Sequence, residues 1–335
     1  MVTKYSKEID FRNLDRNLDF IKTAAEHNSS ISNKAFRSGT YEIDKCPICS
    51  SLGTIFLKEI NKFLWNKCET CGHFFVSNLP TEISLIYEVG NEAQQTAYIS
   101  DDLFIKRRKM ISKPKAEFIN SVVPSTDRKG LWVDIGCGVG ELICEASALG
   151  WETIGFDADP NEVSFANKNG INVEQMYISE NKVFNADFLK YLGKAKVVSA
   201  INVMEHIIDP VSWLDKVVGH LSNDTYIAIE VPREPSITSL CNIIGLPYKH
   251  MMTAGHYHIF TEDSMQIIQN KLKLEAIAKW CFGNGFVDLI NTALWLSSAE
   301  IEESVLTTVL DKSQEVQKTI DEAGLSEAMI IITKK

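Results

Sequence analysis

The sequence has no apolar run long enough to cross a membrane and no leader-like segment at its start. None of its 335 residues belongs to a stretch approaching the roughly 18 apolar residues that a spanning helix needs. The opening MVTKYSKEIDFRNLDRNLDF is too polar for a secretory signal peptide. We therefore expect a cytoplasmic protein without a membrane span, whose length allows one large core or two to three smaller units.

Positive charge is also scarce. The net charge is -10 at pH 7, and residues 131–335 hold 15 Lys and Arg against 28 Asp and Glu. A surface that binds nucleic-acid phosphates needs clustered Lys and Arg, because much of its affinity comes from counterion release. The basic run KRRK (106–109) is interpreted as the solvated face of a helix. The composition therefore argues against nucleic acid as a partner.

Four of the eight cysteines are regularly spaced. CPIC and CETC place two Cys-x2-Cys pairs at a spacing typical of a four-thiolate zinc site, with Cys46, Cys49, Cys68 and Cys71 as ligands. A redox dithiol and a disulfide pair are the alternatives, and the expected compartment favours zinc. The remaining cysteines are interpreted as core residues: Cys137, Cys144, Cys241 and Cys281.

The segment between the two cysteine pairs, GTIFLKEINKFLWNK, predicts two short strands around a polar turn, and hence a zinc ribbon. Gly72 allows the left-handed turn that such a knuckle needs, and His73 is interpreted as a bystander. Four protein ligands leave no open position on the ion, so the zinc should be structural. A unit this small should depend on the metal to fold.

The regions around the ribbon suggest a division into 1–40, 41–80, 81–128 and 129–335. The first is a helix followed by the Ser/Asn-rich linker NSSISN; the second is the ribbon. In the third, SDDLFIKRRKMISKPKAEFINSV predicts a helical connector that packs the ribbon against the fourth region, with a kink or split at Pro114.

From residue 131 onward, apolar strands alternate with amphipathic helices. Such alternation, with nearly continuous apolar strands, predicts an α/β fold with a parallel sheet covered on both faces. The ligand of such a sheet lies beyond the carboxyl ends of the strands. The glycine-rich turn VDIGCGVGE (133–141) directly follows the first of these strands and is therefore the candidate binding loop.

The turn lacks the Gly-Lys-Ser/Thr of a triphosphate loop, because Gly140 is followed by Glu141 and Leu142. Glu141 also holds the place of the last glycine in the dinucleotide fingerprint, where an acid would repel a pyrophosphate. A ligand without phosphate is therefore favoured. Asp134 is placed to accept from an amino group and Asp157 from ribose hydroxyls, which points to S-adenosylmethionine, a nucleoside that carries an amino acid.

From about residue 100 to 335 the sequence resembles the class I S-adenosylmethionine-dependent methyltransferases. VDIGCGVGE resembles their first motif, GFDADP their acidic second-strand end, NADFL their adenine-flanking turn and INVMEHIIDP their fourth-strand motif. The resemblance implies a Rossmann-like sheet whose seventh strand, in EAMIIITKK, is antiparallel. It also implies Asp187 near the adenine amino group and Phe188 against the ring. The full set of implied cofactor contacts is Asp134, Gly136, Cys137, Gly138, Gly140, Asp157, Ala158, Asp187, Phe188, Asn202, Val203 and Met204.

Four residues near the expected methyl-transfer end are candidate catalytic groups. Glu205 and His206 follow the fourth strand, and His256 and His258 lie in AGHYHIF, after a long insertion that begins near Arg233. A general base matters only if the acceptor must lose a proton. His206 also has an architectural or substrate-positioning interpretation, and Glu205 could brace the turn.

EHIIDP together with HYHIF resembles two groups of methyltransferases. One is the sugar C-methyltransferases of polysaccharide or natural-product pathways, which also carry an N-terminal cysteine zinc segment. The other is the quinone-type O-methyltransferases, which lack the ribbon. The ribbon favours a sugar or a nucleotide-sugar or polysaccharide precursor as the small-molecule acceptor. The C-methyltransferases continue into a further domain beyond the seventh strand, so O-methylation stays equally open.

Two other functions stay open. The first is an RNA methyltransferase whose ribbon grips RNA; the acidic catalytic half and NVMEH in place of an Asn/Asp-Pro-Pro-aromatic turn argue against it. The second is a non-catalytic module that binds the cofactor. Residues 286–324 should be helical and could cap the substrate, pack on the core or form the face of a homodimer.

Overall fold

The computed structural model describes residues 1–7, 18–86, 99–177, 184–240, 249–297 and 302–335. The interpretation of Cys241 as a core residue falls outside these ranges. In the described part of the chain, none of the helices combines the length and apolarity that a bilayer crossing requires.

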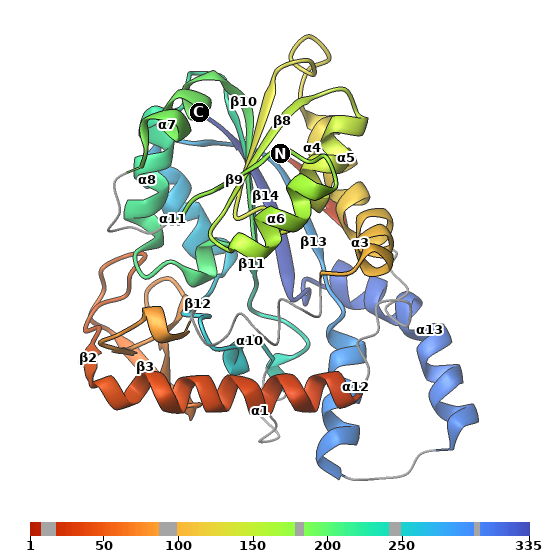
Figure 1. Cartoon of the computed structure of the whole chain (residues 1–335). Coiled ribbons are helices and arrows are strands. Elements are labelled where there is room, and N and C mark those ends of the chain that lie inside the picture. The colour runs from red at the N-terminus through yellow and green to blue at the C-terminus, as the bar shows by residue number, and fades with distance from the viewer. Residues whose placement is uncertain (8–17, 87–98, 178–183, 241–248, 298–301) are drawn as a thin grey trace.

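The centre of the molecule is an eight-stranded sheet with the order β1-β13-β14-β11-β10-β7-β8-β9 (Figure 1). Only β14 runs antiparallel to its neighbours, and the other pairs are parallel. The predicted Rossmann-like sheet with an antiparallel last strand is therefore confirmed. Its strands are β1 (Val2–Tyr5), β7 (Leu131–Ile135), β8 (Glu152–Asp157), β9 (Val173–Gln175), β10 (Ala195–Ile201), β11 (Tyr226–Pro232), β13 (Glu275–Phe282) and β14 (Ala328–Lys334).

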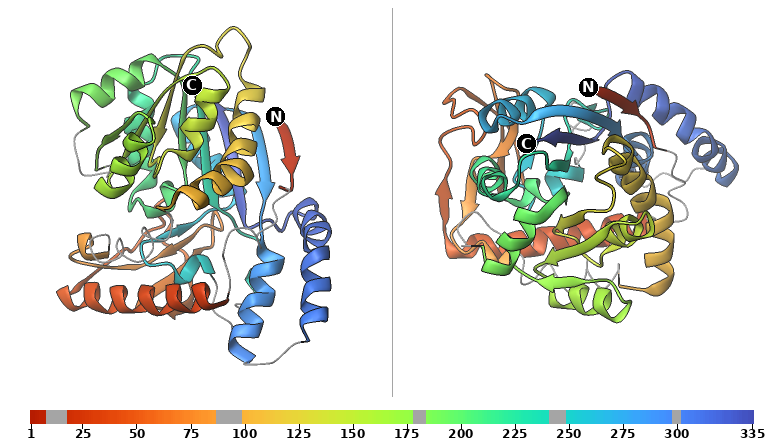
Figure 2. Two further views of the ribbon diagram at one scale, coloured as in Figure 1. Left: turned by 45° about the vertical axis from the view of Figure 1, so that its right-hand side comes forward. Right: turned by 90° about the horizontal axis from the view of Figure 1, so that it is seen from above.

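Helices cover both faces of this sheet, because alternate strand residues point to opposite sides. On β7, Val133 and Ile135 join one buried cluster and Trp132 joins the other. The first cluster includes α7 (Ala186–Lys194), α8 (Pro210–His220) and α11 (Glu262–Leu272). The second lies under α4 (Lys113–Val122) and α5 (Glu141–Ala148), with α6 (Pro160–Lys168) nearby (Figures 1 and 2).

The amino-terminal strand β1 is a feature that the sequence did not reveal. It pairs in parallel with β13 at one edge of the sheet (Figure 2). The indole nitrogen of Trp280 donates to the Ser6 carbonyl at 2.7 Å, and Lys4 Nζ lies 3.8 Å from the centre of the same ring. The strand is exposed along its whole length, so its residues carry no apolar alternation from which it could be predicted.

The expected linker NSSISN is instead the last part of a helix, α1 (Leu18–Ala35). Its Ile31, Ser32 and Ala35 are buried at helical spacing. Ser32 Oγ donates to the carbonyl of Asn28 at 2.8 Å, and the Asn28 side chain accepts from the Ala254 backbone at 3.0 Å. Because these polar groups are satisfied inside the helix and across the interface, the Ser/Asn-rich composition does not end it.

The predicted helix after Ser100 is confirmed, and Ser100 caps it by accepting from the Leu103 backbone. It runs as α3 (Asp101–Arg107), a π-helical turn (Arg108–Ser112) and α4. The π turn lies directly before Pro114, where a helix cannot keep its regular hydrogen bonds. The expectation that this segment packs on the ribbon was wrong. It packs along α5 (Figure 1). Two ion pairs join them, Arg107–Glu141 at 2.6 Å and Arg108–Glu145 at 2.8 Å. The basic run KRRK (106–109) is therefore more than the solvated face of a helix, because its two arginines form these ion pairs.

The hairpin predicted between the two cysteine pairs is confirmed as β3 (Thr54–Ile60) and β4 (Phe63–Cys68). Its turn residues Asn61 and Lys62 both have positive φ, as in a two-residue hairpin turn. The sheet continues with β5 (Phe74–Val76) and then β12 (His258–Ile259), a strand from the catalytic half. The ribbon and the insertion after Arg233 therefore share one sheet. A second small sheet pairs β2 (Thr40–Glu42) with β6 (Asn78–Pro80).

Residues 286–324 are helical as expected, in α12 (Gly285–Ser297) and α13 (Glu303–Glu322), apart from 298–301, which lie outside the described ranges. The two helices lie side by side below the β1 edge of the sheet (Figure 2). The Gln317 side chain of α13 accepts from the Phe286 backbone at 3.0 Å. The remaining short elements are η2 (Phe36–Ser38), η4 (Met204–His206) and α10 (Lys249–Met252).

Candidate active site and metal centre

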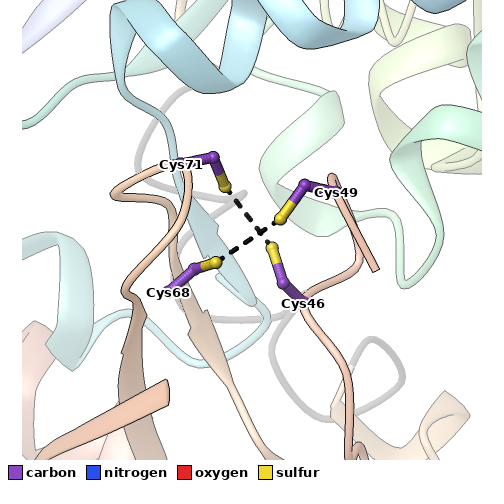
Figure 3. Close-up of side chains that lie close together, drawn as sticks. All are labelled: Cys46, Cys49, Cys68 and Cys71. Carbon is purple, nitrogen blue, oxygen red and sulfur yellow. Dashed lines mark hydrogen bonds between the residues drawn. The ribbon is translucent and has the colours of Figure 1, made fainter. Parts of the chain in front are cut away.

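The four ribbon cysteines converge on one point (Figure 3). The Sγ atoms of Cys46 and Cys71 are 3.6 Å apart and those of Cys49 and Cys68 are 3.5 Å apart, and all four atoms lie within 4.8 Å of one another. Four sulfurs around a tetrahedral ion at about 2.3 Å would be about 3.8 Å apart. The donor set and its spacing therefore fit a four-thiolate zinc site.

The two knuckles have the same backbone geometry. The Ser50 amide donates to the Cys46 carbonyl at 2.8 Å, and the Gly72 amide donates to the Cys68 carbonyl at 3.0 Å. Ser50 and Gly72 have φ of 64° and 67°, so the left-handed turn expected at Gly72 is confirmed. The Cys71 thiol, facing Cys46, lowers the pKa of Cys46 to about 5. A metal-ready thiolate is therefore favoured there.

His73 links the ribbon to the catalytic half. It is fully buried, with Nε2 3.1 Å from Nδ1 of His258. His258 Nε2 donates to the Ile207 carbonyl at 2.8 Å, so its Nδ1 accepts from His73. Burial lowers the pKa of His258 to about 4. The structure thus places His258 between the ribbon and the turn after β10, apart from the other three catalytic candidates.

A pocket of about 170 Å³ lies at the carboxyl ends of β7 and β10, where the ligand of a parallel sheet is expected. Five predicted cofactor residues line it, together with residues from α5, α6 and the helix before β7. The predicted set is Asp134, Gly136, Cys137, Gly138 and Asn202.

The glycine loop approaches the turn after β10 so closely that side chains are excluded. Gly136 has a φ of 68°, and a Cβ there would lie 2.6 Å from Cγ2 of Val203. Gly140 has a φ of 79° and would bring a Cβ within 2.8 Å of Ile171. The amide of Gly138 donates to Asp157 at 2.7 Å. Asp157 therefore fixes the loop and lies outside the pocket lining.

One buried acid, Asp134, and one half-buried acid, Glu162, give the pocket a preference for cations. Asp134 accepts from Ser199 Oγ at 2.5 Å, and Ser199 itself accepts from the Trp132 indole at 2.8 Å. Burial raises the pKa of Asp134 to about 7 and that of Glu162 to about 8. Removal from water disfavours the charged form of both carboxyl groups. A positively charged ligand stabilises that form, so it would lower both pKa values as it binds.

Part of the pocket wall comes from the helix before β7, which the sequence did not assign to the site. Arg107, Ser112 and Lys115 all line the pocket. Lys115 is buried and pairs with Glu230 at 2.6 Å. Arg107 pairs with Glu141, so the acid expected to repel phosphate is compensated. Rejection of phosphate would depend instead on Asp134 and Glu162.

The other predicted cofactor residues lie outside the pocket lining. Phe188 is fully buried, with ring centres 4.9 Å from Phe156 and 5.0 Å from Phe184. Its ring packs in the core rather than presenting a free face. Asp187 and Ala158 are exposed, and Met204 is fully buried. Residues 178–183, just before NADFL, lie outside the described ranges.

Three of the four catalytic candidates come together. The ligand atoms of Glu205, His206 and His256 lie within 4.8 Å of one another. His206 Nδ1 lies 2.8 Å from the Gly255 carbonyl, and the two imidazole ring centres are 4.8 Å apart. Burial raises the pKa of Glu205 to about 8 and lowers the pKa of His206.

A family model described as a methyltransferase domain matches residues 106–287, which is more than half of the chain. The chain belongs to this methyltransferase family. The matched range runs from the helix that lines the pocket to the start of α12, and it begins after the ribbon. The predicted enzyme class is thereby confirmed.

Solved structures of methyltransferases share the fold. An S-adenosylmethionine-dependent methyltransferase from Archaeoglobus fulgidus is 20% identical, with a TM-score of 0.44 over 70% of this chain and 98% of that one. Phosphoethanolamine N-methyltransferase 2 from Haemonchus contortus is 12% identical, with a TM-score of 0.51 over 81% of this chain and 63% of that one. A comparison with curated protein sequences finds no match.

Proposed function

We propose that this methyltransferase uses S-adenosylmethionine as its methyl donor and acts on a small molecule. The observation that carries the proposal is the pocket after β7, in which a glycine loop meets the carboxylates of Asp134 and Glu162 in a methyltransferase domain. The Haemonchus enzyme, which has the same fold, was solved in complex with S-adenosylmethionine.

The residues of the pocket fit this donor. Gly136 lets the loop lie directly against Val203 at the edge of the pocket, because a Cβ there would be 2.6 Å from Cγ2 of Val203. Asp134 would hold the ammonium group of the donor, and Arg107 and Lys115 are the cations within reach of its carboxylate. When bound, the donor supplies a methyl group on a positively charged sulfur, which leaves as a neutral thioether.

The protein itself would align the two reactants and exclude water. Good orientation alone can lower the activation barrier by on the order of 7–11 kcal/mol. Val139, Leu142 and Ile201 form the apolar part of the pocket wall. At the acceptor side, Glu205 is close enough to Lys115, a pocket residue, for their charges to interact. Glu205, His206 and His256 would therefore position the acceptor and receive or direct its proton.

Donor binding should strengthen as the pH rises through about 7. Below its pKa of about 7, Asp134 is neutral and attracts the donor ammonium weakly. Above it the carboxylate is already charged and attracts the ammonium group without any change of protonation. Near and below a pH of about 7, binding of the cation lowers the pKa of Asp134 and therefore releases a proton. The raised pKa of Asp134 has the opposite effect on the folding of the ligand-free protein. Its contribution to folding stability is present at low pH and is lost as the pH rises through about 7.

Calorimetry with S-adenosylhomocysteine in buffers of different ionisation enthalpy measures this proton release. We expect the affinity to rise by up to about tenfold per pH unit below the pKa. In Asp134→Asn the affinity should be lower and its dependence on pH between about 6 and about 8 should flatten. An affinity that falls with rising pH in the wild type would contradict the role of Asp134.

We further propose a sugar, nucleotide sugar or polysaccharide precursor as the acceptor. The ribbon together with EHIIDP and HYHIF supports this class. The test is transfer of a labelled methyl group from the donor to a panel of sugar nucleotides, with total RNA as a parallel substrate. Label in a sugar product supports the proposal. Label in RNA, or donor binding with no transfer to any metabolite fraction, overturns the acceptor assignment.

We propose that the four-cysteine site holds zinc as a structural ion. Its four ligands leave no position for substrate. The ribbon supplies β5, on which β12 pairs, so the metal would act on catalysis by holding the segment that carries His256.

A further inference from the structure

We propose that Glu205, His206 and His256 bind a divalent transition-metal ion, separate from the ribbon zinc, at the acceptor side of the active site. These three residues are called the Glu–His–His cluster. The ion would use its open positions to hold oxygen atoms of the acceptor. This last part rests on the proposed methyltransferase function, whereas the metal site itself does not.

The first observation is the donor set. One carboxylate and two imidazoles offer ligand atoms within 4.8 Å of one another. They come from two segments: η4 after β10, and the residues that lead into β12. Two histidines and one carboxylate leave positions open in non-haem iron sites, and His2Glu is also a known ligand set of catalytic zinc.

The second observation is the orientation of the rings. His206 Nδ1 lies 2.8 Å from the Gly255 carbonyl, and His256 Nδ1 lies 3.1 Å from the His250 carbonyl. A carbonyl can only accept, so both Nδ1 atoms carry the hydrogen and both Nε2 atoms carry the lone pair of a neutral ring. A backbone carbonyl that fixes the tautomer in this way is the usual outer partner of a metal-bound histidine.

The third observation is the environment of Glu205. The residue is 1% exposed, and its Oε2 has no hydrogen-bond partner in the part of the chain that the structure describes. Lys115, whose positive charge acts on Glu205, is already paired with Glu230 at 2.6 Å. A buried carboxylate oxygen without a partner is costly. A bound cation would satisfy it.

The two segments are also held in register. The Tyr257 amide donates to the Glu205 carbonyl at 2.8 Å, and His258 donates to the Ile207 carbonyl at 2.8 Å. These bonds flank His206 on one segment and directly follow His256 on the other. The three donors are therefore preorganised by the sheet that β12 shares with the ribbon.

The ligand class follows from the donors and their position. Mixed imidazole and carboxylate ligands suit Zn²⁺, Fe²⁺ or Co²⁺ better than Mg²⁺ or Ca²⁺, which prefer all-oxygen sites. With three protein ligands, such an ion keeps positions for two oxygens of a vicinal diol or a hydroxy-carbonyl group. A sugar offers such a pair of oxygens.

Cobalt is the probe, because its absorption distinguishes the two sites. The full chain, with one zinc already in the ribbon, is titrated with Co²⁺. We expect one further equivalent, with visible bands of a nitrogen and oxygen site and without thiolate-to-cobalt charge transfer. His256→Ala and Glu205→Ala should each weaken this binding by about 100-fold or more, since even outer-shell changes cost about 10–100-fold.

His220→Ala is the matched control. His220 is exposed at the end of α8 and its ring is bonded to the Lys216 carbonyl, so its loss should leave cobalt binding unchanged. Zinc content and circular dichroism report whether each variant is folded, and His206→Asn provides a second, smaller change in the cluster. The proposal is overturned if the wild type binds no second ion, or if folded His256→Ala and His206→Asn bind cobalt as the wild type does.

Titration of the same samples with S-adenosylhomocysteine separates this proposal from the proposed function. Donor-product binding without any bound cobalt overturns the metal site and leaves the proposed methyl donor standing. One bound cobalt without donor-product binding supports the metal site and overturns the proposed donor.

Discussion

Replacing Cys68 by serine should release the ribbon metal and unfold residues 45–76, while the eight-stranded sheet stays folded. Cys68 is fully buried at the end of β4, and its Sγ faces Cys49. Metal binding supplies about 10–16 kcal/mol to the folding of small zinc domains. The hairpin of β3 and β4 has too small a core to compensate for that loss.

Loss of the ribbon metal should also disturb the active site. β12 pairs with β5, and Thr261 Oγ1 donates to the Cys71 carbonyl at 2.9 Å. Loss of the ribbon therefore removes the support of the segment that carries His256. We expect methyl transfer to fail in Cys68→Ser even though the donor pocket, at the ends of β7 and β10, still binds S-adenosylhomocysteine.

Metal analysis and hydrogen exchange measure both consequences. Zinc should fall from one equivalent per chain to none, with fast exchange confined to the ribbon and β12. Cys144→Ser is the control, because this cysteine lies on α5 outside the four-thiolate site. It should keep its zinc and its exchange pattern. A full equivalent of zinc in Cys68→Ser would show that the four cysteines do not form the site.

Gly136→Ala should abolish donor binding. At a φ of 68° an alanine is strained by about 1–2 kcal/mol, and its Cβ would lie 2.6 Å from Cγ2 of Val203. Relief of this clash must move either the glycine loop or the turn before Glu205, and both border the pocket. We expect the affinity for S-adenosylhomocysteine to fall by at least about 100-fold, because a displacement of about 1 Å at a site can have an effect of that size.

Gly170→Ala is the control that distinguishes backbone strain from the steric clash with Val203. Gly170 has a φ of 75°, but a Cβ there meets nothing within 4 Å. It should lose a similar amount of stability from backbone strain and keep its donor affinity. Equal affinities for Gly136→Ala and the wild type would mean that the donor does not lie against this loop.

Most of the central sheet could be predicted because its strands are buried on both faces. β11, for example, is buried at every residue, and a mostly apolar run such as this one, interrupted only by Glu230, is recognisable without the rest of the fold. The convergence of the four ribbon cysteines was predictable for a different reason. Two short Cys-x2-Cys loops have few ways to place their thiolates other than around one ion.

The parts that sequence reasoning missed depend on contacts between distant segments. Lys115 lines the pocket only because α4 packs along α5 and brings it to Glu230, more than a hundred positions later. His258 was expected at the active site, but its partner proves to be His73 of the ribbon. The resemblance of NADFL implied that the Phe188 ring faces the adenine, but the motif could not show which way the ring points, and the ring packs against Phe156 and Phe184.

Calorimetric titration of the full chain with S-adenosylhomocysteine and, separately, with NAD⁺ tests the central claim most directly. Asp134 and Glu162 should favour the amino-acid-bearing nucleoside and reject a pyrophosphate, so we expect one equivalent of S-adenosylhomocysteine and no binding of NAD⁺. Binding of NAD⁺ without binding of S-adenosylhomocysteine would contradict the account.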